Sequence, residues 1–302
     1  MTPCSIVRSW LFACLCLLVA SQAFADTRDI KSRWVSAISA DNVTALRALL
    51  DEADESAELN VDRESDEYSD TKSELDPLWK LTASNGKSAL MVACKVGDVD
   101  LAERLVELGA NIKDRTITNG TAFMFAVLGD QTGMAQWLAG LGANINAQGS
   151  NGWTGVMIAS AKGLDTTLSW LLSEDANAQL PDVYGFSPLM RASDNGHTEA
   201  VRLLLSVGKD PSHDVAQAVD VHWQDELENT ALHYAVAGNQ FEIVQLLLEA
   251  NARVKTKNRA GLSALDIALG FQNKAVVASG NQSLKERQEK ILEALLRFEK
   301  SG

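Results

Sequence analysis

Cys94 is the only cysteine outside the N-terminal segment 1–25 of this chain. Cys4, Cys14 and Cys16 all lie within that segment. A single remaining thiol cannot form an internal disulfide. Because Cys94 directly follows Ala93 in an expected helix, an inert buried thiol is the favoured interpretation, and a reactive thiol is the alternative.

Four methionines recur at a constant spacing along the chain, namely Met91, Met124, Met157 and Met190. Thioether sulfur is a ligand that Cu(I) favours, so a copper site is one interpretation. Packed helices lie about 8–10 Å apart, which is too far for such side chains to share one ion readily. The favoured interpretation is therefore that the methionines pack in the core.

Two polar segments carry side chains of the types that bind metals. One segment contains His213, Asp214, Asp220, His222 and Asp225. The other contains Asp62, Glu64 and Asp66, with Glu67 at the position where a calcium-binding loop needs glycine. Because neither spacing makes ligands converge, we expect solvated loops, with weak calcium binding as the alternative for the second. The sequence thus indicates no catalytic residue, no metal site, no cofactor and no enzyme activity.

The elements that would position any site belong to an internal repeat. A six-residue motif occurs at Ser88–Ala93, Thr121–Ala126, Thr154–Ala159, Ser187–Ala192, Thr230–Ala235 and Ser263–Ala268. Its final alanines are evenly spaced, except that Ala192 and Ala235 are further apart than the others. Leucine-rich segments follow the motifs and end at Gly109, Gly142, Asp175, Gly208 and Asn251. The pattern predicts helix pairs, each begun by a Ser or Thr N-cap and ended by a residue that accepts left-handed backbone.

This pattern resembles the ankyrin repeat, which has a 33-residue period, a β-turn plus two helices, and a Thr-Pro-Leu-His-x-Ala signature. The resemblance implies an all-α ankyrin-repeat solenoid of about six full repeats plus an incomplete N-terminal unit. The chain departs from the family pattern, because only Pro188 retains the proline of the motif and only His233 retains the histidine. In the family that histidine ties neighbouring turns together by hydrogen bonds.

The expected boundaries are an incomplete repeat unit at 26–50, an acidic insertion at 51–84 and the repeat array at 85–302. The stretch from Asp51 to Asp76 contains 12 acidic and 2 basic residues, so most of the net charge of −13 lies there. Further insertions are expected near 211–226 and 270–283. A C-terminal capping helix, opened by Ser283 and Glu286, should then close the array.

Residues 1–25 have the organisation of a cleavable export signal. Arg8 precedes an apolar run from Trp10 to Ala20, and Ala23-Phe24-Ala25 provides a cleavage site. The run is too short to span a bilayer, which needs about 20 residues, although an N-terminal anchor is the alternative. We therefore expect a periplasmic or secreted protein of the exported bacterial type, with no stable membrane insertion after cleavage. The negative net charge also argues against a nucleic-acid partner.

Candidate partner-binding residues stand just ahead of the Ser or Thr of each motif. In the ankyrin family these positions project into a concave groove, and here they are Lys87, Gly120, Trp153, Phe186, Asn229 and Leu262. Trp153 and Phe186 are neighbours in the repeat, Tyr184 lies two residues before Phe186, and Trp223 could reach the same rim. Aromatic anchors of this kind are common hot spots of interfaces. We therefore expect Trp153, Tyr184, Phe186, Trp223 and Leu262 to bind another protein, with coverage by the insertions as the alternative.

The sequence thus favours an exported, non-enzymatic scaffold that binds a partner protein through the concave face of its repeats. A secreted enzyme or toxin, for which the protein would be an accessory or an inhibitor, is one such partner. A metal- or redox-responsive periplasmic protein is the alternative function.

Overall fold

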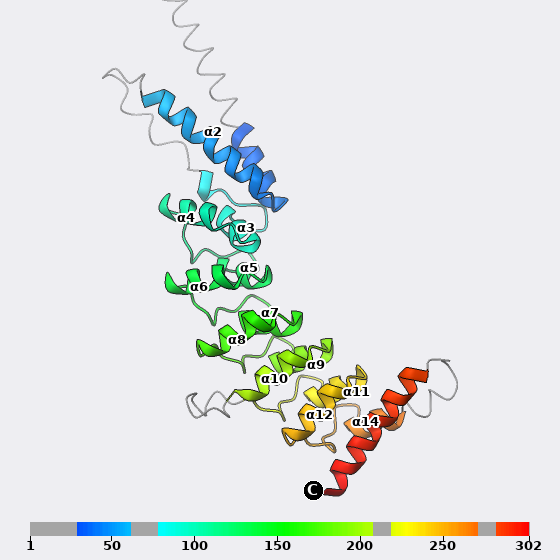
Figure 1. The fold of residues 1–302 in the computed structure, drawn as a ribbon. Helices are drawn as coiled ribbons and strands as arrows, with labels where there is room; N and C mark the ends of the chain where they lie inside the picture. The colour runs from blue at the N-terminus through cyan, green and yellow to red at the C-terminus, as the bar shows by residue number, and fades with distance from the viewer. Residues whose placement is uncertain (1–28, 62–77, 208–218, 271–281, 302) are drawn as a thin grey trace, which may run out of the picture. The chain divides into compact units, whose positions relative to one another are not determined.

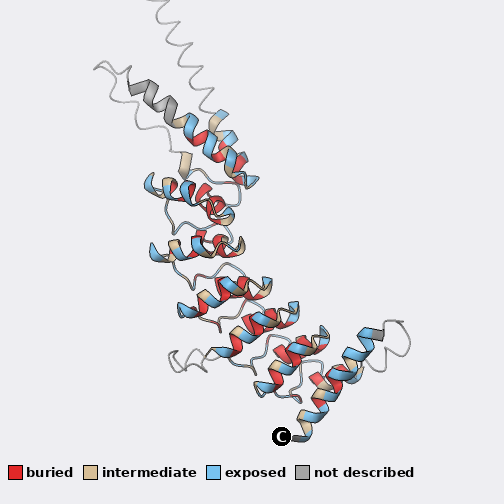
Figure 2. Cartoon of the chain, in the orientation of Figure 1, coloured by how far each residue is buried: buried red, intermediate tan, exposed pale blue. Residues whose placement is uncertain are grey.

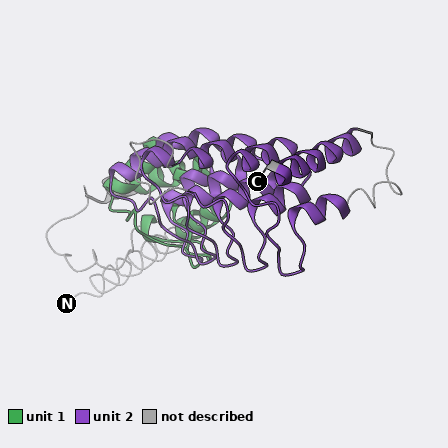
Figure 3. Cartoon of the chain, turned by 90° about the horizontal axis from the view of Figure 1, so that it is seen from below, with its two compact units in different colours: residues 1–117 green, residues 118–302 purple. Residues whose placement is uncertain are grey.

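The computed structural model describes residues 29–61, 78–207, 219–270 and 282–301. The chain divides into two compact units, residues 1–117 and residues 118–302, which are coloured separately in Figure 3. Helices dominate both units, and the β-pairing within the described residues consists of isolated bridges, between Thr82 and Ser88 and between Lys257 and Ser263. No described helix is long and apolar enough to cross a membrane. The signal peptide expected at 1–25 lies outside the described residues.

Unit 1 contains two helix pairs. Its helices are 29–39, α2 (Val43–Val61), the short 3-10 helix η1 (Leu78–Lys80), α3 (Ala89–Val96) and α4 (Val99–Glu107). Asn42 caps α2, since its Oδ1 accepts the backbone N–H of Ala45 at 3.0 Å. Trp34, Ile38 and Leu46 are fully buried where the first pair packs. The expected incomplete unit at 26–50 is thus a helix pair, but α2 continues well past Leu50 into the expected acidic insertion.

Ion pairs join the two helix pairs of unit 1. Charged residues on α2, and in the turn before it, face charged residues on α3 and α4 or at their ends. The pairs are Asp41 with Lys87 and with Lys95, both at 2.7 Å, Arg47 with Asp98 and with Asp100, the latter at 3.3 Å, and Asp51 with Arg104 at 2.7 Å. Asp51, which the sequence assigned to the acidic insertion, therefore helps to hold α2 in place.

Unit 2 is a stack of helix pairs (Figure 1). The pairs are α5 (Ala122–Leu128) with α6 (Thr132–Gly140), α7 (Gly155–Lys162) with α8 (Asp165–Ser173), α9 (Pro188–Asn195) with α10 (Thr198–Ser206), and α11 (Ala231–Ala237) with α12 (Phe241–Glu249). The first helices contact one another in the order α5, α7, α9 and α11, and the second helices in the order α6, α8, α10 and α12. Buried residues lie on the sides that face neighbouring helices (Figure 2).

The motif residues act as the sequence predicts. Ser88, Thr121, Thr154 and Ser187 each accept, through the side-chain oxygen, the backbone N–H three residues later, at 3.1–3.3 Å. The alanines that end the motifs are buried, at 0–3% exposure, so the helices can approach closely. Left-handed backbone occurs at Gly109, Gly142, Asp175 and Asn251, whereas Gly208 lies outside the described residues. Local chemistry thus fixes where these first helices begin and where the chain reverses after the second helices.

The single motif histidine ties two turns of unit 2 together. Nδ1 of His233 accepts the backbone N–H of Thr230 at 3.0 Å, so Nε2 is the protonated nitrogen and donates to the carbonyl of Leu262 at 3.2 Å. The side chain is 2% exposed, and this burial lowers its pKa. The expected role of this histidine is therefore confirmed.

Backbone hydrogen bonds link the tips of successive turns in unit 2, which project to one side of the helices in Figure 3. In each case an N–H of one tip donates to a carbonyl of the tip before it. The pairs are Ser150 with Thr118, Val183 with Asn151, Glu226 with Tyr184, and Arg259 with Leu227, at 2.9–3.1 Å. A side chain at Gly152, whose φ is +81°, would place its Cβ 2.8 Å from the Cα of Asp182, so only glycine permits this approach.

The described part of the second expected insertion, 211–226, includes a repeat turn. Oδ1 of Asp220 accepts the backbone N–H of His222 at 2.8 Å, as Oδ1 of Asn177 accepts that of Gln179 in the preceding repeat. Residues from Asp220 onward therefore form a regular repeat turn. The C-terminal part of the segment expected to be an insertion is thus a repeat turn. The rest of this insertion falls largely outside the described residues.

The last part of unit 2 is a helix at 264–270 followed by α14 (Gln282–Ser301). Residues 271–281, in the third expected insertion, are not among the described residues. Helix α14 packs on α12 and buries Ile291, Leu292 and Leu295, while most of its other described residues face solvent. Such a polar outer face is typical of a capping helix. The helix begins one residue before Ser283, so the expected N-cap lies inside its first turn.

Candidate functional site

An acceptor side chain shapes three successive turns of unit 2, and in the first two it is a buried aspartate. Oδ1 of Asp182 accepts the backbone N–H groups of Tyr184 and Phe186, at 2.9 and 3.0 Å. Oδ1 of Asp225 likewise accepts the backbone N–H groups of the second and fourth residues after it, both at 2.9 Å. Oδ1 of Asn258 accepts the equivalent two N–H groups of its own turn, both at 3.0 Å. The turn therefore holds the residue ahead of the Ser or Thr cap in a set position.

Trp153 and Phe186, the two aromatic residues that the sequence singled out, are joined through Arg191. The Cζ atom of the Arg191 guanidinium lies 3.9 Å from the ring centroid of Phe186 and 5.4 Å from that of Trp153. The same guanidinium forms an ion pair with Asp182, whose side chain is fully buried. The two rings are half-buried rather than fully projecting, because Arg191 lies against both. The 33-residue spacing predicts that Trp153 and Phe186 lie on neighbouring turns, but it gives no sign of the arginine between them.

Phe186 also packs against Tyr234 of the next repeat, with ring centroids 5.0 Å apart. The Tyr234 hydroxyl donates to Oδ2 of Asp225. Burial, reinforced by this hydrogen bond, raises the pKa of Tyr234. We call the series Trp153, Arg191, Phe186 and Tyr234 the aromatic ladder. Cation–π and tilted aromatic contacts each contribute about 0.5–2 kcal/mol, so the ladder is preorganised before any partner binds.

The other expected site residues lie on the turns beside the ladder. Tyr184 is 60% exposed and immediately precedes Gly185, whose carbonyl accepts the indole N–H of Trp223 at 2.8 Å. Trp223 is 37% exposed, so part of its ring stays in solvent while its indole N–H is held at the turn that carries Tyr184. Leu262 is 45% exposed, and its carbonyl is the acceptor for His233. All five residues therefore belong to successive turns of unit 2.

Comparison with known proteins identifies the repeat. Profiles described as ankyrin repeats match residues 68–149, 123–215 and 215–268, which together span more than half of the chain. The chain belongs to the ankyrin-repeat family. Ankyrin repeats mediate protein–protein interactions, and proteins of this family are generally non-enzymatic interaction modules. No curated protein matches the chain.

Arg191 and Tyr234 are the site residues that sequence reasoning missed. They occupy the same position of the ankyrin motif, the fifth, which elsewhere holds Val92, Phe125, Ile158 and Ile267. A charged residue among apolar ones at this position was the available signal. The motif alone could not show the role of Arg191, because its guanidinium contacts Asp182 and the rings of Trp153 and Phe186, which lie outside the motif.

The redox and copper interpretations gain no support. Cys94 is fully buried, and burial raises the pKa of its thiol to about 12. At neutral pH such a thiol carries almost no thiolate, the reactive form. The four regularly spaced methionines are 0–8% exposed and pack in the core, as favoured above.

The expected loop clusters do not form a metal site within the described residues, which hold no group of three or more potential ligands that converge. Asp220 and Asp225 instead accept hydrogen bonds from the backbone of their own turn. His213 and Asp214 lie outside the described part of the chain, and so do Asp62, Glu64 and Asp66.

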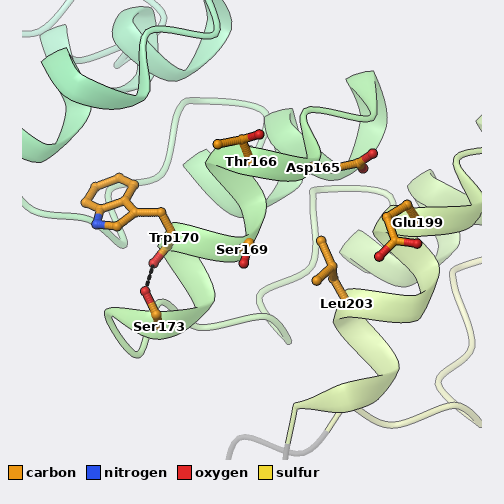
Figure 4. Close-up of a pocket in the computed structure, with 7 residues that line it drawn as sticks. All are labelled: Asp165, Thr166, Ser169, Trp170, Ser173, Glu199 and Leu203. Atoms are coloured by element: carbon orange, nitrogen blue, oxygen red, sulfur yellow. Dashed lines mark hydrogen bonds between the residues drawn. The ribbon is translucent and has the colours of Figure 1, made fainter.

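A shallow groove of about 520 Å³ lies between α8 and α10, on the row of second helices. Asp165 and Glu199 extend toward the same gap, whereas the ring of Trp170 points away from it (Figure 4). Burial and the charge of Glu199 both raise the pKa of Asp165. The groove combines hydroxyls with two carboxylates, but its described residues do not form a catalytic arrangement.

Proposed function

We propose that this ankyrin array is an exported, non-enzymatic scaffold that holds a partner protein on its concave face. The aromatic ladder carries the proposal. It combines Trp, Tyr and Arg, the residue types most enriched among interface hot spots. Tyr184 stands on the turn of Phe186, Trp223 and Leu262 stand on the two turns that follow, and all three add exposed apolar surface.

The rigidity of the ladder supports a binding role. Ordering flexible side chains at an interface costs about 0.5–1.5 kcal/mol for each one. Here Asp182 and Asp225 fix the turns, and Arg191 is held by an ion pair and two rings. A partner would therefore meet side chains that are already ordered, and half-buried rings still offer it apolar area.

The proposed location rests on the sequence of residues 1–25. An export signal and the lack of a cysteine pair fit a protein that depends on packing for its stability outside the cytoplasm. In that compartment we propose a secreted enzyme or toxin as the partner, which the array would assist or inhibit.

The experiment is a cross-linking capture in the native compartment, with bound proteins identified by mass spectrometry. The test variant is Trp153→Ser with Phe186→Ser, and the control is Trp137→Ser on α6, a half-buried tryptophan in the row of second helices. We expect one partner to be captured by the wild type and the control and lost with the double variant. Equal capture by all three proteins would refute the ladder as the site, and recovery only from the cytoplasm would refute export.

A further inference from the structure

Two equivalent turns of unit 2 each contain a buried carboxylate, and the two carboxylates have different partners. Asp182 and Asp225 occupy the same position of successive repeats, and both accept two backbone N–H groups. The second oxygen of Asp182 meets the guanidinium of Arg191, so its charge is balanced. The second oxygen of Asp225 meets only the neutral hydroxyl of Tyr234. Among the described residues, the negative charge of Asp225 therefore has no cation beside it.

The charges around the Tyr234 turn add to this imbalance. Asp194 lies one helical turn beyond Arg191 on α9, and its charge acts on Tyr234. Glu226 and Glu228 follow Asp225 in the same turn. All three side chains are exposed, and none forms an ion pair within the described part of the chain. Lys257 and Arg259, on the next turn, are nearby exposed cations, but the four acidic groups remain in excess.

The two ends of the aromatic ladder also differ in whether a cation lies over the rings. At Trp153 and Phe186 the protein supplies its own cation, since Arg191 contacts both rings. Tyr234 occupies the motif position of Arg191 one repeat later. No described cation lies over its ring. A ring next to unbalanced carboxylates is a favourable place for a cation, because the π-face and the carboxylates attract it together.

We infer that the partner inserts an arginine or lysine side chain beside Tyr234, where it extends the ladder by one more cation. This inference rests on the proposed function and names the chemistry of its partner: a basic segment that also carries apolar or aromatic side chains. An acidic segment would meet Asp194, Glu226 and Glu228, and would find the charge of Arg191 already balanced by Asp182. Such like-charge contacts reduce affinity and exclude wrong partners.

The test uses random peptides displayed on phage and selected against the purified protein. We expect the recovered peptides to be enriched in arginine or lysine next to aromatic or aliphatic residues. Their affinity should fall by about tenfold or more in the variant Asp194→Asn, Glu226→Gln, Glu228→Gln, because close charge pairs at interfaces couple strongly. The matched control is Glu174→Gln with Glu242→Gln, which removes exposed charge elsewhere in unit 2.

The outcomes separate this inference from the proposed function. Neutral or acidic peptides that still require Trp153 and Phe186 would overturn the inference and leave the proposed function standing. Peptides that are insensitive to both sets of substitutions would overturn both. The inference of a basic partner is also wrong if the selection enriches no peptide sequence. It is equally wrong if the selected peptides bind the acidic-residue variant and its control with the same affinity.

Discussion

Unit 1 and unit 2 join their successive helix pairs by different means. In unit 1, Asp41, Arg47 and Asp51 reach across from the first pair to charged partners on the second. In unit 2, buried alanines, methionines and leucines fill the space between pairs, and backbone bonds link the turns. Ion pairs at a surface are weakened by salt and solvent, whereas apolar packing is not. The comparison therefore predicts that the two units respond differently to charge removal, salt and pH.

The largest effect is expected at the ion pair of Arg191 and Asp182, which is the buried charge pair among the described residues of unit 2. Arg191→Met should leave the fully buried carboxylate of Asp182 unpaired, at a cost of about 3–5 kcal/mol in the free energy of unfolding. Urea denaturation followed by fluorescence measures this loss. Combining it with Asp182→Asn should restore most of the stability, because the amide oxygen can still accept the two backbone N–H groups. A single variant as stable as the wild type would mean that the pair is dispensable.

A core truncation in unit 2 should have a slightly smaller effect. Met157 is fully buried in α7, so Met157→Ala should cost about 2–5 kcal/mol, the range for removing a large apolar side chain from a core. This loss should be the same at low and high salt. A clear salt dependence in the urea midpoint shift would show that charge, and not packing, governs the stack.

Charge removal in unit 1 should cost less and should depend on salt. Asp41→Asn keeps a residue type that tolerates the left-handed backbone found there, at φ 52°, but removes the charge that faces Lys87 and Lys95. The expected loss is about 1–2 kcal/mol, because hydrogen bonds to charged groups are worth somewhat more than neutral ones. Faster hydrogen exchange in α3 measures it. The difference from the wild type should shrink as salt is raised, and an unchanged difference would contradict the ionic description.

The smallest effect concerns pH. Burial lowers the pKa of His233, so the unfolded chain binds a proton below about pH 6.5 while the folded chain resists it. Stability of the α11 region should therefore fall as the pH drops from about 7 to about 5. In unit 1, the hydrogen bond from Arg47 lowers the pKa of Asp98, so that contribution is kept until the pH falls below about 4.

Hydrogen exchange at neutral pH and near pH 5 compares the two regions in one experiment. After correction for the intrinsic effect of pH on the exchange rate, we expect α11 to exchange faster near pH 5 than at neutral pH. The corrected rates of α4 should be the same at both pH values. His233→Gln should remove the extra pH dependence of α11. If the variant keeps it, another group is responsible.

The local features of the fold could be predicted from sequence because each depends on residues close together in the chain. The N-caps at Thr154 and Ser187 and the left-handed Asp175 follow from residue type alone. The length of α2 could not be inferred, since its extension past Leu50 is stabilised in part by the distant Arg104. The role of Arg191 could not be inferred for a similar reason, because Trp153 comes from the preceding repeat, while Asp182 and Phe186 come from the turn before α9.

The backbone bonds between the turn tips have a consequence for how this surface can change over time. The N–H of Val183 and the carbonyl of Asn151 hold two tips together whatever side chains those residues carry. Substitutions at exposed tip residues such as Val183, Tyr184 and Leu227 can therefore alter what is recognised while the spacing of the turns stays the same. An engineer could randomise these positions on the existing scaffold and obtain new specificities at little cost in stability.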